Sequence, residues 1–531
     1  MQQDLEYGKP KRGGVLLGEG CFSQKAEVRA EDGSPQSMED GNSVGAYTQE
    51  VEAKKYPGAR RRQKPSSTVW HLILMLGDLT LLFIALMLVL VLVPIDHFRF
   101  QVTSHAFITQ EFKLIWICLA LASWSIAVNI TQSQGVTYIS SRFKSPFCTV
   151  FALVLMGIFW IILSYFLIGI GFKTLVWIEL LFLAVAIPLF TSWRVLLAEI
   201  INRPQYRRLA VIVGVNSAGR MLTKELRSAR HPGVNVLGFI GTGESAEEGL
   251  YLDEVPILGG SATLRSLVQH NLIDMIIIAL DYAVAPELFK EATQAAQRGI
   301  AVVPMTVVFE STTGKIPVEH VGDQWSVALQ SERTLSPFYL CWRKILDVAC
   351  GLCGLLALGL VLPLIALCIY LDSPGPIFYT QERLGLYGKP FRIYKFRSMR
   401  TDAEDEGYAI WANEYDPRVT RVGHFLRITH LDELPQLCNI LRGDMSLIGP
   451  RPERAAFIAE LGKTIPFYGY RLACKPGLTG WAQVKYRYGR SENDALNKLQ
   501  YDLYYIKRQS FMLDIFIILK TVVEVLSLRG S

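Results

Sequence analysis

Long hydrophobic runs with almost no charge fill the first part of the chain, at about residues 69–93, 112–131, 147–170 and 175–199. Each run is close to the ~20 residues that an α-helix needs to cross the hydrocarbon core of a bilayer. Residues 1–66 are polar and have no apolar periodicity, which is typical of a disordered tail. The pattern predicts a disordered cytoplasmic tail over residues 1–66 and four transmembrane helices within residues 67–201.

Basic residues mark the side of the membrane on which these helices end. They lie in the run 60–64 before the first helix, at 142 and 144 between the second and third, and at 203, 207 and 208 after the fourth. Cytoplasmic loops carry such an excess of Lys and Arg, so both ends of the bundle are expected in the cytoplasm. Asp78 and Glu179 lie inside the runs, where a functional site and polar contacts between helices are both open interpretations.

The next part of the chain changes to alternating strands and helices. Short apolar runs at 209–214, 234–240, 275–279 and 300–304 are typical of buried strands, and 283–298 has a helical pattern. This alternation predicts a Rossmann-like α/β domain with a parallel sheet over residues 205–310, followed by a connector over 311–336. The turn at 214–219 (GVNSAG) lacks the full GxGxxG spacing, so nucleotide binding and simple packing both stay open.

A further apolar run covers residues 345–371 and is interrupted by Pro363. Basic residues flank it on both sides, starting with Arg343 and Lys344 before it and Arg383 after it. Both flanks therefore favour the cytoplasm, which a single crossing does not allow. We predict a re-entrant helix that breaks near Pro363 and returns to the same side. The alternative, an ordinary fifth span, would place the following domain outside the cell.

Composition agrees with a membrane protein, since half of the 531 residues are hydrophobic, 19% are charged and the mean hydropathy is +0.26. The net charge of +6 comes from basic clusters beside apolar runs, and no nucleic-acid-binding motif is present, so nucleic acid is excluded as a partner. The nine cysteines are scattered. The CxxC pair Cys350/Cys353 stands in an apolar run without a second pair, which favours packing over a redox or metal site. A reducing, cytoplasmic environment is expected for the soluble parts.

The chemistry is concentrated in residues 431–437 (LDELPQL) and 449–453 (GPRPE). Because proline is tolerated only in the first turn of a helix, Pro435 predicts a helix that begins near Asp432. Amides at that helix end would keep Asp432 ionised and would also favour phosphate. One of two adjacent carboxylates can attack while the other holds a metal, and Arg451 between two prolines suits phosphate binding. The alternative is that both acids only cap a helix.

Ordered motifs in the last third of the chain carry a family resemblance. They are RKILD at 343–347, SPGPIF at 373–378, QERLG at 381–385, YKFRSM at 394–399, DPRVTRVG at 416–423, LDELPQL, GPRPE and KPGLTGWAQV at 475–484. Residues 337–531 thus resemble the polyprenyl-phosphate hexose-1-phosphate transferases, also called monotopic phosphoglycosyl transferases or bacterial sugar transferases. The bundle and the α/β domain resemble the large, three-part members of this family. One departure is Leu362-Pro363, where many relatives have Ser-Pro.

The resemblance implies a fold and a reaction. The fold is a four-helix transmembrane bundle, an α/β Rossmann-like cytoplasmic domain, and a mainly α catalytic domain with a re-entrant membrane helix. Asp432 would be the nucleophile that attacks the β-phosphorus of a UDP-sugar and releases UMP. Glu433 would bind Mg²⁺, and undecaprenyl phosphate would then take the phosphosugar from Asp432.

The same resemblance implies further contacts and a setting. Arg427, Arg451 and Arg397 would bind substrate phosphates, and Gln483 would help to shape the nucleotide or sugar pocket. The enzyme would sit in the bacterial inner membrane with its soluble domains in the cytoplasm, at the first membrane step of exopolysaccharide, capsule or O-antigen synthesis. The transferred sugar, the pathway and nucleotide binding by the α/β domain stay open, and a homodimer is one use for that domain.

Two other functions stay open at this stage. A membrane glycosyl transferase would move only the sugar and release UDP. A non-catalytic membrane protein would sense a nucleotide through its α/β domain or take part in an assembly, and its acidic pair would be structural.

Overall fold

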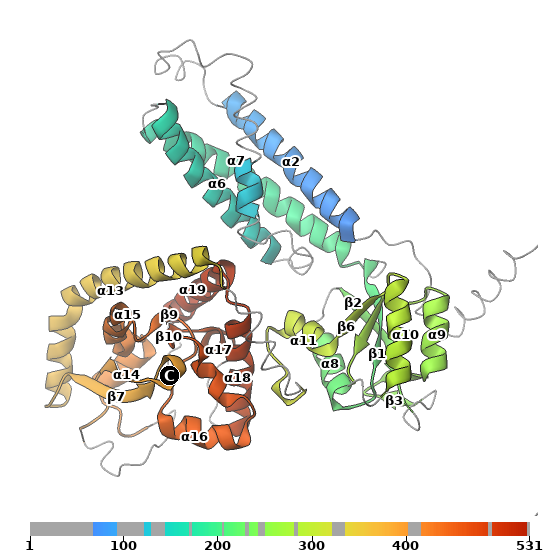
Figure 1. The fold of residues 1–531 in the computed structure, drawn as a ribbon. Coiled ribbons are helices and arrows are strands. Elements are labelled where there is room, and N and C mark those ends of the chain that lie inside the picture. The colour runs from blue at the N-terminus through green and yellow to red at the C-terminus, as the bar shows by residue number, and fades with distance from the viewer. Residues whose placement is uncertain are drawn as a thin grey trace, which may run out of the picture. The chain divides into compact units, whose positions relative to one another are not determined.

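The computed structural model describes residues 67–92, 122–128, 144–168, 172–203, 206–228, 233–242, 250–280, 285–320, 335–401, 416–486 and 491–527. The predicted tail over 1–66 lies outside these residues, as does most of the predicted span 112–131, of which residues 122–128 are helical. Three groups of elements follow one another along the chain: long helices, an α/β sheet, and a C-terminal domain (Figure 1).

The long N-terminal helices are α2 (Ser67–Leu92), α6 (Lys144–Ile168) and α7 (Phe172–Ile201). Each contains a stretch long and apolar enough to cross a membrane, so three of the four predicted apolar runs form helices of membrane-spanning length. Helices α2 and α7 are joined by a fully buried ion pair, in which Arg194 donates to Asp78 at 2.5 Å. Asp78 thus makes a polar contact between helices, and Glu179 of α7 lies against Gly157 of α6.

The middle domain contains a sheet of strand order β3-β4-β2-β1-β5-β6. The strands are β1 (Arg208–Val213), β2 (Val234–Ile240), β3 (Tyr251–Leu252), β4 (Val255–Gly259), β5 (Met275–Ile278) and β6 (Ala301–Pro304). All pairs are parallel except β3–β4, so the predicted parallel sheet is confirmed. The helices are α8 (Ser217–Ser228), α9 (Ser261–Gln269), α10 (Pro286–Gln297) and α11 (Met305–Thr313). Sequence patterns did not predict β4, whose short run contains a proline.

The turn between β1 and α8 is filled by its own residues. The Asn216 side chain donates from Nδ2 to the Ala279 carbonyl at 2.7 Å, and its Oδ1 accepts from the Gly219 amide at 2.9 Å. The second bond caps the start of α8. Gly214 has a φ of +124°, which only glycine adopts readily. These contacts give the turn a packing role that needs no ligand.

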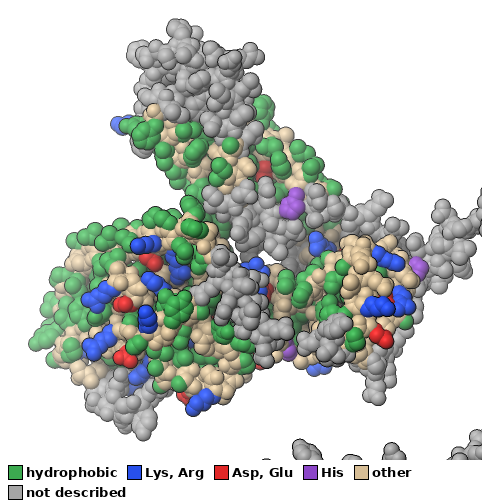
Figure 2. Space-filling model, viewed as in Figure 1, with side chains coloured by type: hydrophobic (Ala, Val, Ile, Leu, Met, Phe, Trp, Pro, Cys, Tyr) green, Lys and Arg blue, Asp and Glu red, His purple; other side chains and the backbone are tan. Residues whose placement is uncertain are grey.

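The C-terminal domain opens with α13 (Pro337–Asp372), a single helix with Pro363 in its interior, and Figure 1 shows that its path bends. Apolar side chains such as Leu356, Leu360 and Leu371 are exposed along it, and hydrophobic side chains gather at this edge of the domain (Figure 2). It is the fourth helix long and apolar enough to cross a membrane. On the inner side, Gly351 and Gly354 lie against leucines of a neighbouring helix, where an added Cβ would meet side-chain carbons at 2.6 Å.

The remaining elements of this domain are short. They are β7 (Phe378–Leu384), η6 (Leu386–Gly388), β8 (Pro390–Phe396), α14 (Arg421–Ile428), η7 (Leu431–Gln436), α15 (Leu437–Arg442), β9 (Ser446–Ile448), α16 (Ala455–Thr464), η8 (Tyr468–Ala473), β10 (Gly477–Thr479), α17 (Trp481–Lys485), α18 (Glu492–Lys507) and α19 (Phe511–Leu526). Strands β7 and β8 form an antiparallel hairpin, and β9 and β10 pair in parallel.

The segment after α11 joins the core of this domain. The amide of Ile316 donates to the Gln500 carbonyl of α18 at 3.0 Å. Ile316 and Val318 are buried in one cluster with Leu499 and Leu503. Part of the stretch predicted as a connector is therefore packed structure, because its two apolar side chains fill the space beside α18.

A buried polar cluster fixes the first part of α13. Asp514 of α19 is fully buried and accepts hydrogen bonds from the hydroxyl groups of Tyr339 (2.8 Å) and Tyr505 (2.9 Å). Arg343 donates to the Ile448 carbonyl at 2.6 Å, and Asp347 accepts from the Leu447 amide at 2.7 Å. Buried charges persist when they are hydrogen-bonded in this way.

The C-terminal end of α13 is bound by other elements of the same domain. Asp372 accepts from the Val422 amide at the start of α14 at 2.8 Å. Just beyond it, the guanidinium of Arg397 donates to the carbonyls of Ser373 and Pro374. Both ends of this apolar helix are thus tied to elements of one compact domain.

Close backbone contacts between three glycines join the strand pair β9–β10 to the loop that follows β9. The Gly449 amide donates to the Thr479 carbonyl at 2.9 Å, and the Gly477 amide donates to the Pro450 carbonyl at 2.9 Å. A Cβ on Gly477 would meet backbone atoms of Gly449, including its Cα at 2.6 Å. A Cβ on Gly480 would likewise meet the Gly449 carbonyl. Only glycine allows this approach.

We therefore expect Gly477→Ala to separate β9 from β10 and to lower the free energy of unfolding by about 3 kcal/mol, the cost of a backbone clash in a packed core. Thermal melting of the detergent-purified protein measures this loss. Gly462→Ala is the matched control, because nothing lies within 4 Å of its Cβ position on α16. Equal melting temperatures for the two variants would contradict the role given to the glycine contact.

Candidate active site

The acidic pair lies on a turn of 3₁₀ helix and not at the start of an α-helix. Element η7 (Leu431–Gln436) carries Asp432 and Glu433, and the α-helix α15 begins only at Leu437. His430, the residue before the turn, has a φ of +56°. Pro435 is accommodated within the 3₁₀ turn. The predicted α-helix start near Asp432 is therefore wrong by about one turn, because Pro435 is taken up by a 3₁₀ turn instead.

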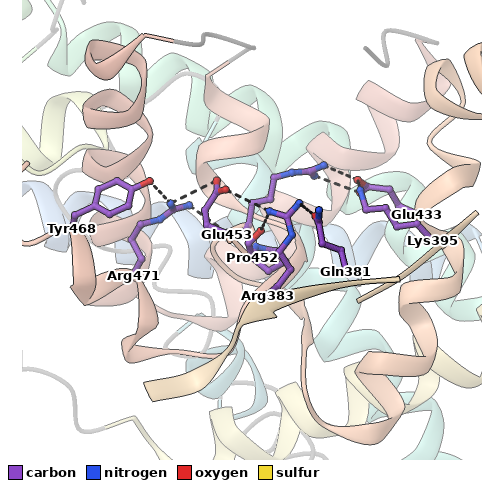
Figure 3. Close-up of polar contacts among 9 residues, drawn as sticks. Gln381, Arg383, Lys395, Glu433, Pro452, Glu453, Tyr468 and Arg471 are labelled. Atoms are coloured by element: carbon purple, nitrogen blue, oxygen red, sulfur yellow. Dashed lines mark hydrogen bonds and ion pairs between the residues drawn. The ribbon is translucent and has the colours of Figure 1, made fainter. Parts of the chain in front are cut away.

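Glu433 is held by two cations. Its Oε1 accepts from Lys395 Nζ of strand β8 at 2.7 Å and from Arg451 Nη2 at 2.6 Å, while its Oε2 has only a longer contact of 3.4 Å with Arg451 Nη1 (Figure 3). Burial alone would raise the pKa of Glu433. The charges of Arg451 and Lys395, and their hydrogen bonds, outweigh this effect and hold the pKa well below its ordinary value.

The pKa of the preceding residue, Asp432, is shifted in the opposite direction. Its carboxyl group is buried, and burial followed by the charge of Glu433 raises its pKa above the ordinary value of 3.8. Lys395, Arg451 and Arg427 oppose this rise. Within the described part of the chain, the Asp432 carboxylate accepts no hydrogen bond. The expected stabilisation by helix amides is therefore absent, and nearby cations are what favour the ionised form.

Arg427 approaches the pair from the last turn of α14. Its Nε donates to the hydroxyl of Ser398 at 2.9 Å, which fixes the guanidinium. Its charge lowers the pKa of Asp432, so it lies within electrostatic reach of that carboxylate. The fold thus brings together four of the residues singled out in the sequence: Asp432, Glu433, Arg427 and Arg451.

The other two predicted contacts lie elsewhere. Arg397 is buried and binds the carbonyls of Ser373 and Pro374 at the end of α13. Gln483 on α17 donates from Nε2 to the Leu478 carbonyl at 3.2 Å. Each retains one buried polar atom, Nε of Arg397 and Oε1 of Gln483, that has no partner among the described residues.

The charged contacts around the loop that carries Arg451, including the buried pair of Arg471 and Asp502, were not predicted. Arg471 of η8 donates from Nε to Asp502 of α18 at 3.0 Å, and Glu453 lies between Arg383 and Arg471 at 3.7 and 3.8 Å (Figure 3). Burial raises the pKa of Asp502 to about 6, against the opposing effect of Arg471. The only available signal was a charge at a core-facing position of the helix, Asp502 between the buried Leu499 and Leu503.

The opposite pKa directions predict opposite effects on stability. Asp432→Asn should raise the free energy of unfolding by about 1 kcal/mol at neutral pH, because it removes a buried carboxylate that destabilises the fold. Glu433→Gln should lower it by about 2 kcal/mol, because Lys395 and Arg451, which are partly exposed, lose their hydrogen bonds to a charged partner. Melting temperatures of the purified variants test both effects.

The gain from Asp432→Asn should depend on pH. A raised folded pKa means that the carboxylate costs stability where it is ionised in the folded state. The gain should be full above that folded pKa and should disappear as the pH falls from it towards the ordinary value of 3.8. A gain that persists unchanged across this range would show that the Asp432 charge is not its cause.

Two regions of the chain match known protein families. Residues 338–528 match the family model for bacterial sugar transferases, and residues 136–302 match that for a CoA-binding domain. The chain is 39% identical over 254 residues to the UDP-N-acetylgalactosamine-undecaprenyl-phosphate N-acetylgalactosaminephosphotransferase of Aeromonas hydrophila. The aligned part covers 47% of this chain and 58% of that relative.

Two further relatives are matched over most of their length. The UDP-glucose:undecaprenyl-phosphate glucose-1-phosphate transferase of Escherichia coli (strain K12) is 34% identical over 60% of this chain and 68% of its own. The exopolysaccharide production protein PSS of Rhizobium leguminosarum bv. phaseoli is 41% identical over 36% of this chain and 98% of its own. The chain therefore belongs to the bacterial sugar transferase family of membrane-bound sugar-1-phosphate transferases.

Proposed function

We propose that this chain moves a sugar 1-phosphate from a UDP-sugar to undecaprenyl phosphate through a covalent intermediate on Asp432. A carboxylate oxygen of Asp432 would attack the β-phosphorus, and the bond to the α-phosphate would break and release UMP. The phosphate of undecaprenyl phosphate would then attack the same phosphorus, form the lipid diphosphosugar and free the carboxylate. A displacement in two steps lets one site serve two anionic substrates in turn.

The observation that carries this proposal is the contrast between the two carboxylates. Glu433 has one oxygen bound to Lys395 and Arg451, so it is held in place and its charge is neutralised. Asp432 is buried, accepts no hydrogen bond within the described residues and has a raised pKa. A nucleophile needs free electron pairs and little solvation, and of the two acids only Asp432 meets both requirements.

The cations around the pair suit the transferred phosphates. Arg451 is 39% exposed at its side chain and Lys395 is 20% exposed, so both can contact a substrate while they hold Glu433. Arg427 adds a third positive charge on the side of α14. Charge spread over phosphoryl oxygens is stabilised by fixed cations of this kind. Arg397 and Gln483 remain predicted contacts, and each has one buried polar atom without a partner among the described residues.

A magnesium ion is compatible with this site. Mg²⁺ is usually bound through one or two carboxylates and the substrate phosphates, and it keeps several waters. Glu433 Oε2, which has only the 3.4 Å contact with Arg451, is the oxygen that would hold it. When bound, the ion would neutralise charge on the diphosphate of the donor. Within the described residues no cluster of three metal-binding side chains exists, so substrate oxygens would have to complete the site.

We also propose that α13 enters and leaves the membrane on one side, the cytoplasmic side of the bacterial inner membrane. Arg343 and Asp347 tie its beginning to β9, and Asp372 ties its end to α14, so both ends belong to one domain. A straight helix of this length would be about 50 Å long, far more than a bilayer core requires. The bend in Figure 1 and the exposed leucines fit insertion from one face.

The reaction is tested by identifying the nucleotide that is released. We expect UMP when the full-length protein in lipid is supplied with undecaprenyl phosphate, Mg²⁺ and UDP-N-acetylgalactosamine or UDP-glucose, the donors named in its relatives. Asp432→Asn should abolish this release, because an amide is not a nucleophile. EDTA should also abolish it, because it would remove the proposed Mg²⁺ ion. Release of UDP would instead show transfer of the sugar alone.

The topology of α13 is tested by labelling single cysteines in a cysteine-free variant. Lys344→Cys, near the start of α13, and Lys389→Cys, beyond its end, change exposed residues. We expect neither to react with a membrane-impermeant maleimide in intact spheroplasts, and both to react in inverted vesicles. Lys173→Cys, at the predicted outer end of α7, is the control that reacts in spheroplasts. Reaction of Lys344→Cys and Lys389→Cys from opposite sides would establish a fifth span.

A further inference from the structure

The loop that carries Arg451 is held by its backbone. Arg471 Nη2 donates to the Arg451 carbonyl at 3.3 Å, and Arg383 Nη1 donates to the next carbonyl, that of Pro452, at 3.3 Å. The Glu453 carbonyl accepts from the Leu384 amide at 3.1 Å. These three donors, together with the Gly477 amide on the Pro450 carbonyl, hold the backbone of the loop, while the Arg451 side chain donates to Glu433. Figure 3 shows Arg383, Arg471 and Glu433 around this loop.

Arg471 is the most constrained of these donors. Its side chain is 5% exposed, and each of its guanidinium nitrogens has a different partner. Nε donates to Asp502 at 3.0 Å, Nη1 to the hydroxyl of Tyr468 at 2.7 Å, and Nη2 to the Arg451 carbonyl. A planar guanidinium with three fixed partners has one orientation, whereas a lysine ammonium in its place could satisfy only part of this set.

We propose that Arg471 is a positioning residue for the transfer, acting through Arg451. It fixes the carbonyl of Arg451 and so sets the point from which the Arg451 side chain extends to Glu433 and to the substrate. The inference rests on the proposed function, since it assumes that Arg451 acts on the donor phosphates. A displacement of about 1 Å at such a contact is enough to cost on the order of 100-fold in rate.

The positive charge of Arg471 does not act on the acidic pair. Asp502, 2% exposed, faces Arg471 and offsets its charge, and Glu453 at 3.8 Å adds a second negative group. The described contacts of Arg471 reach the Arg451 backbone and not the acidic pair. Its influence on the reaction therefore depends on geometry, and replacing it by a lysine keeps the charge but loses the geometry.

The test is a double-mutant cycle on kcat/KM for UMP release by the full-length protein in lipid. Arg471→Lys alone should lower kcat/KM by roughly 10- to 100-fold. If Arg471 acts through Arg451, it should cause no further loss once Arg451 is replaced by glutamine, so the double variant should match Arg451→Gln within about 2-fold. A loss in the double variant equal to the product of the two single losses would overturn the proposal.

The control variant is Lys507→Gln, on the same helix as Asp502. Lys507 also forms a buried ion pair, with Glu310 at 3.0 Å, but it does not contact the loop. Its effect should multiply with that of Arg451→Gln, as expected for damage to the fold alone. Tyr468→Phe, which removes one partner of Arg471, gives a milder variant for the same cycle if Arg471→Lys does not fold.

The positioning role and the proposed function can be tested separately. If Arg451→Gln is too slow to assay, the same cycle is measured on UDP-sugar affinity, from the rise in melting temperature that the ligand causes. Failure of the wild-type protein to release UMP would count against the proposed function itself. UMP release by the wild type together with independent losses in the cycle would leave that function intact and reject the positioning role.

Discussion

The structure depends on a constraint that its central motif creates: two carboxylates on consecutive residues must share a buried site. Two buried negative charges at this distance repel each other, and neither can be desolvated without compensation. The fold meets the constraint asymmetrically. Glu433 receives Lys395 from β8 and Arg451 from the loop after β9, and their charges hold its pKa low. Asp432 is left with burial and the charge of its neighbour, which raise its pKa. One acid is thus held by two cations, while the other is buried with a raised pKa.

The rest of the C-terminal domain supplies the parts of this arrangement from distant stretches of chain. Lys395 comes from a hairpin strand, Arg427 from the end of α14, and Arg451 from a loop bound by glycine contacts at Gly477 and by the guanidinium of Arg471. Helix α13 packs against α15, the helix that directly follows the acidic turn, through Gly351 and Gly354. The apolar helix and the acidic turn therefore share one packed core.

Much of the fold was predictable because it is encoded by local patterns. The apolar runs of α2, α6 and α7 and the strands of the α/β sheet follow from hydrophobic periodicity, and motif order led to the acidic pair and to Arg451. The 3₁₀ turn was not predictable, since Pro435 is compatible with both helix types near a start. Arg397 was expected at a phosphate but binds the carbonyls of Ser373 and Pro374, because an arginine donor suits any oxygen and the sequence does not show which one it meets.

Buried charges outside the motifs are the part that sequence reading misses, and the reason is physical. Arg471 and Asp502 are 31 positions apart, and each looks like a surface charge when read alone. The two charges form a stable buried contact only when both are desolvated together, since a single buried charge would be expelled or neutralised. In this domain Arg471 of the pair donates to the backbone carbonyl of Arg451, the residue whose side chain binds Glu433. In the proposed mechanism the motif residues supply the chemistry, while this buried pair sets the position of the loop that carries Arg451.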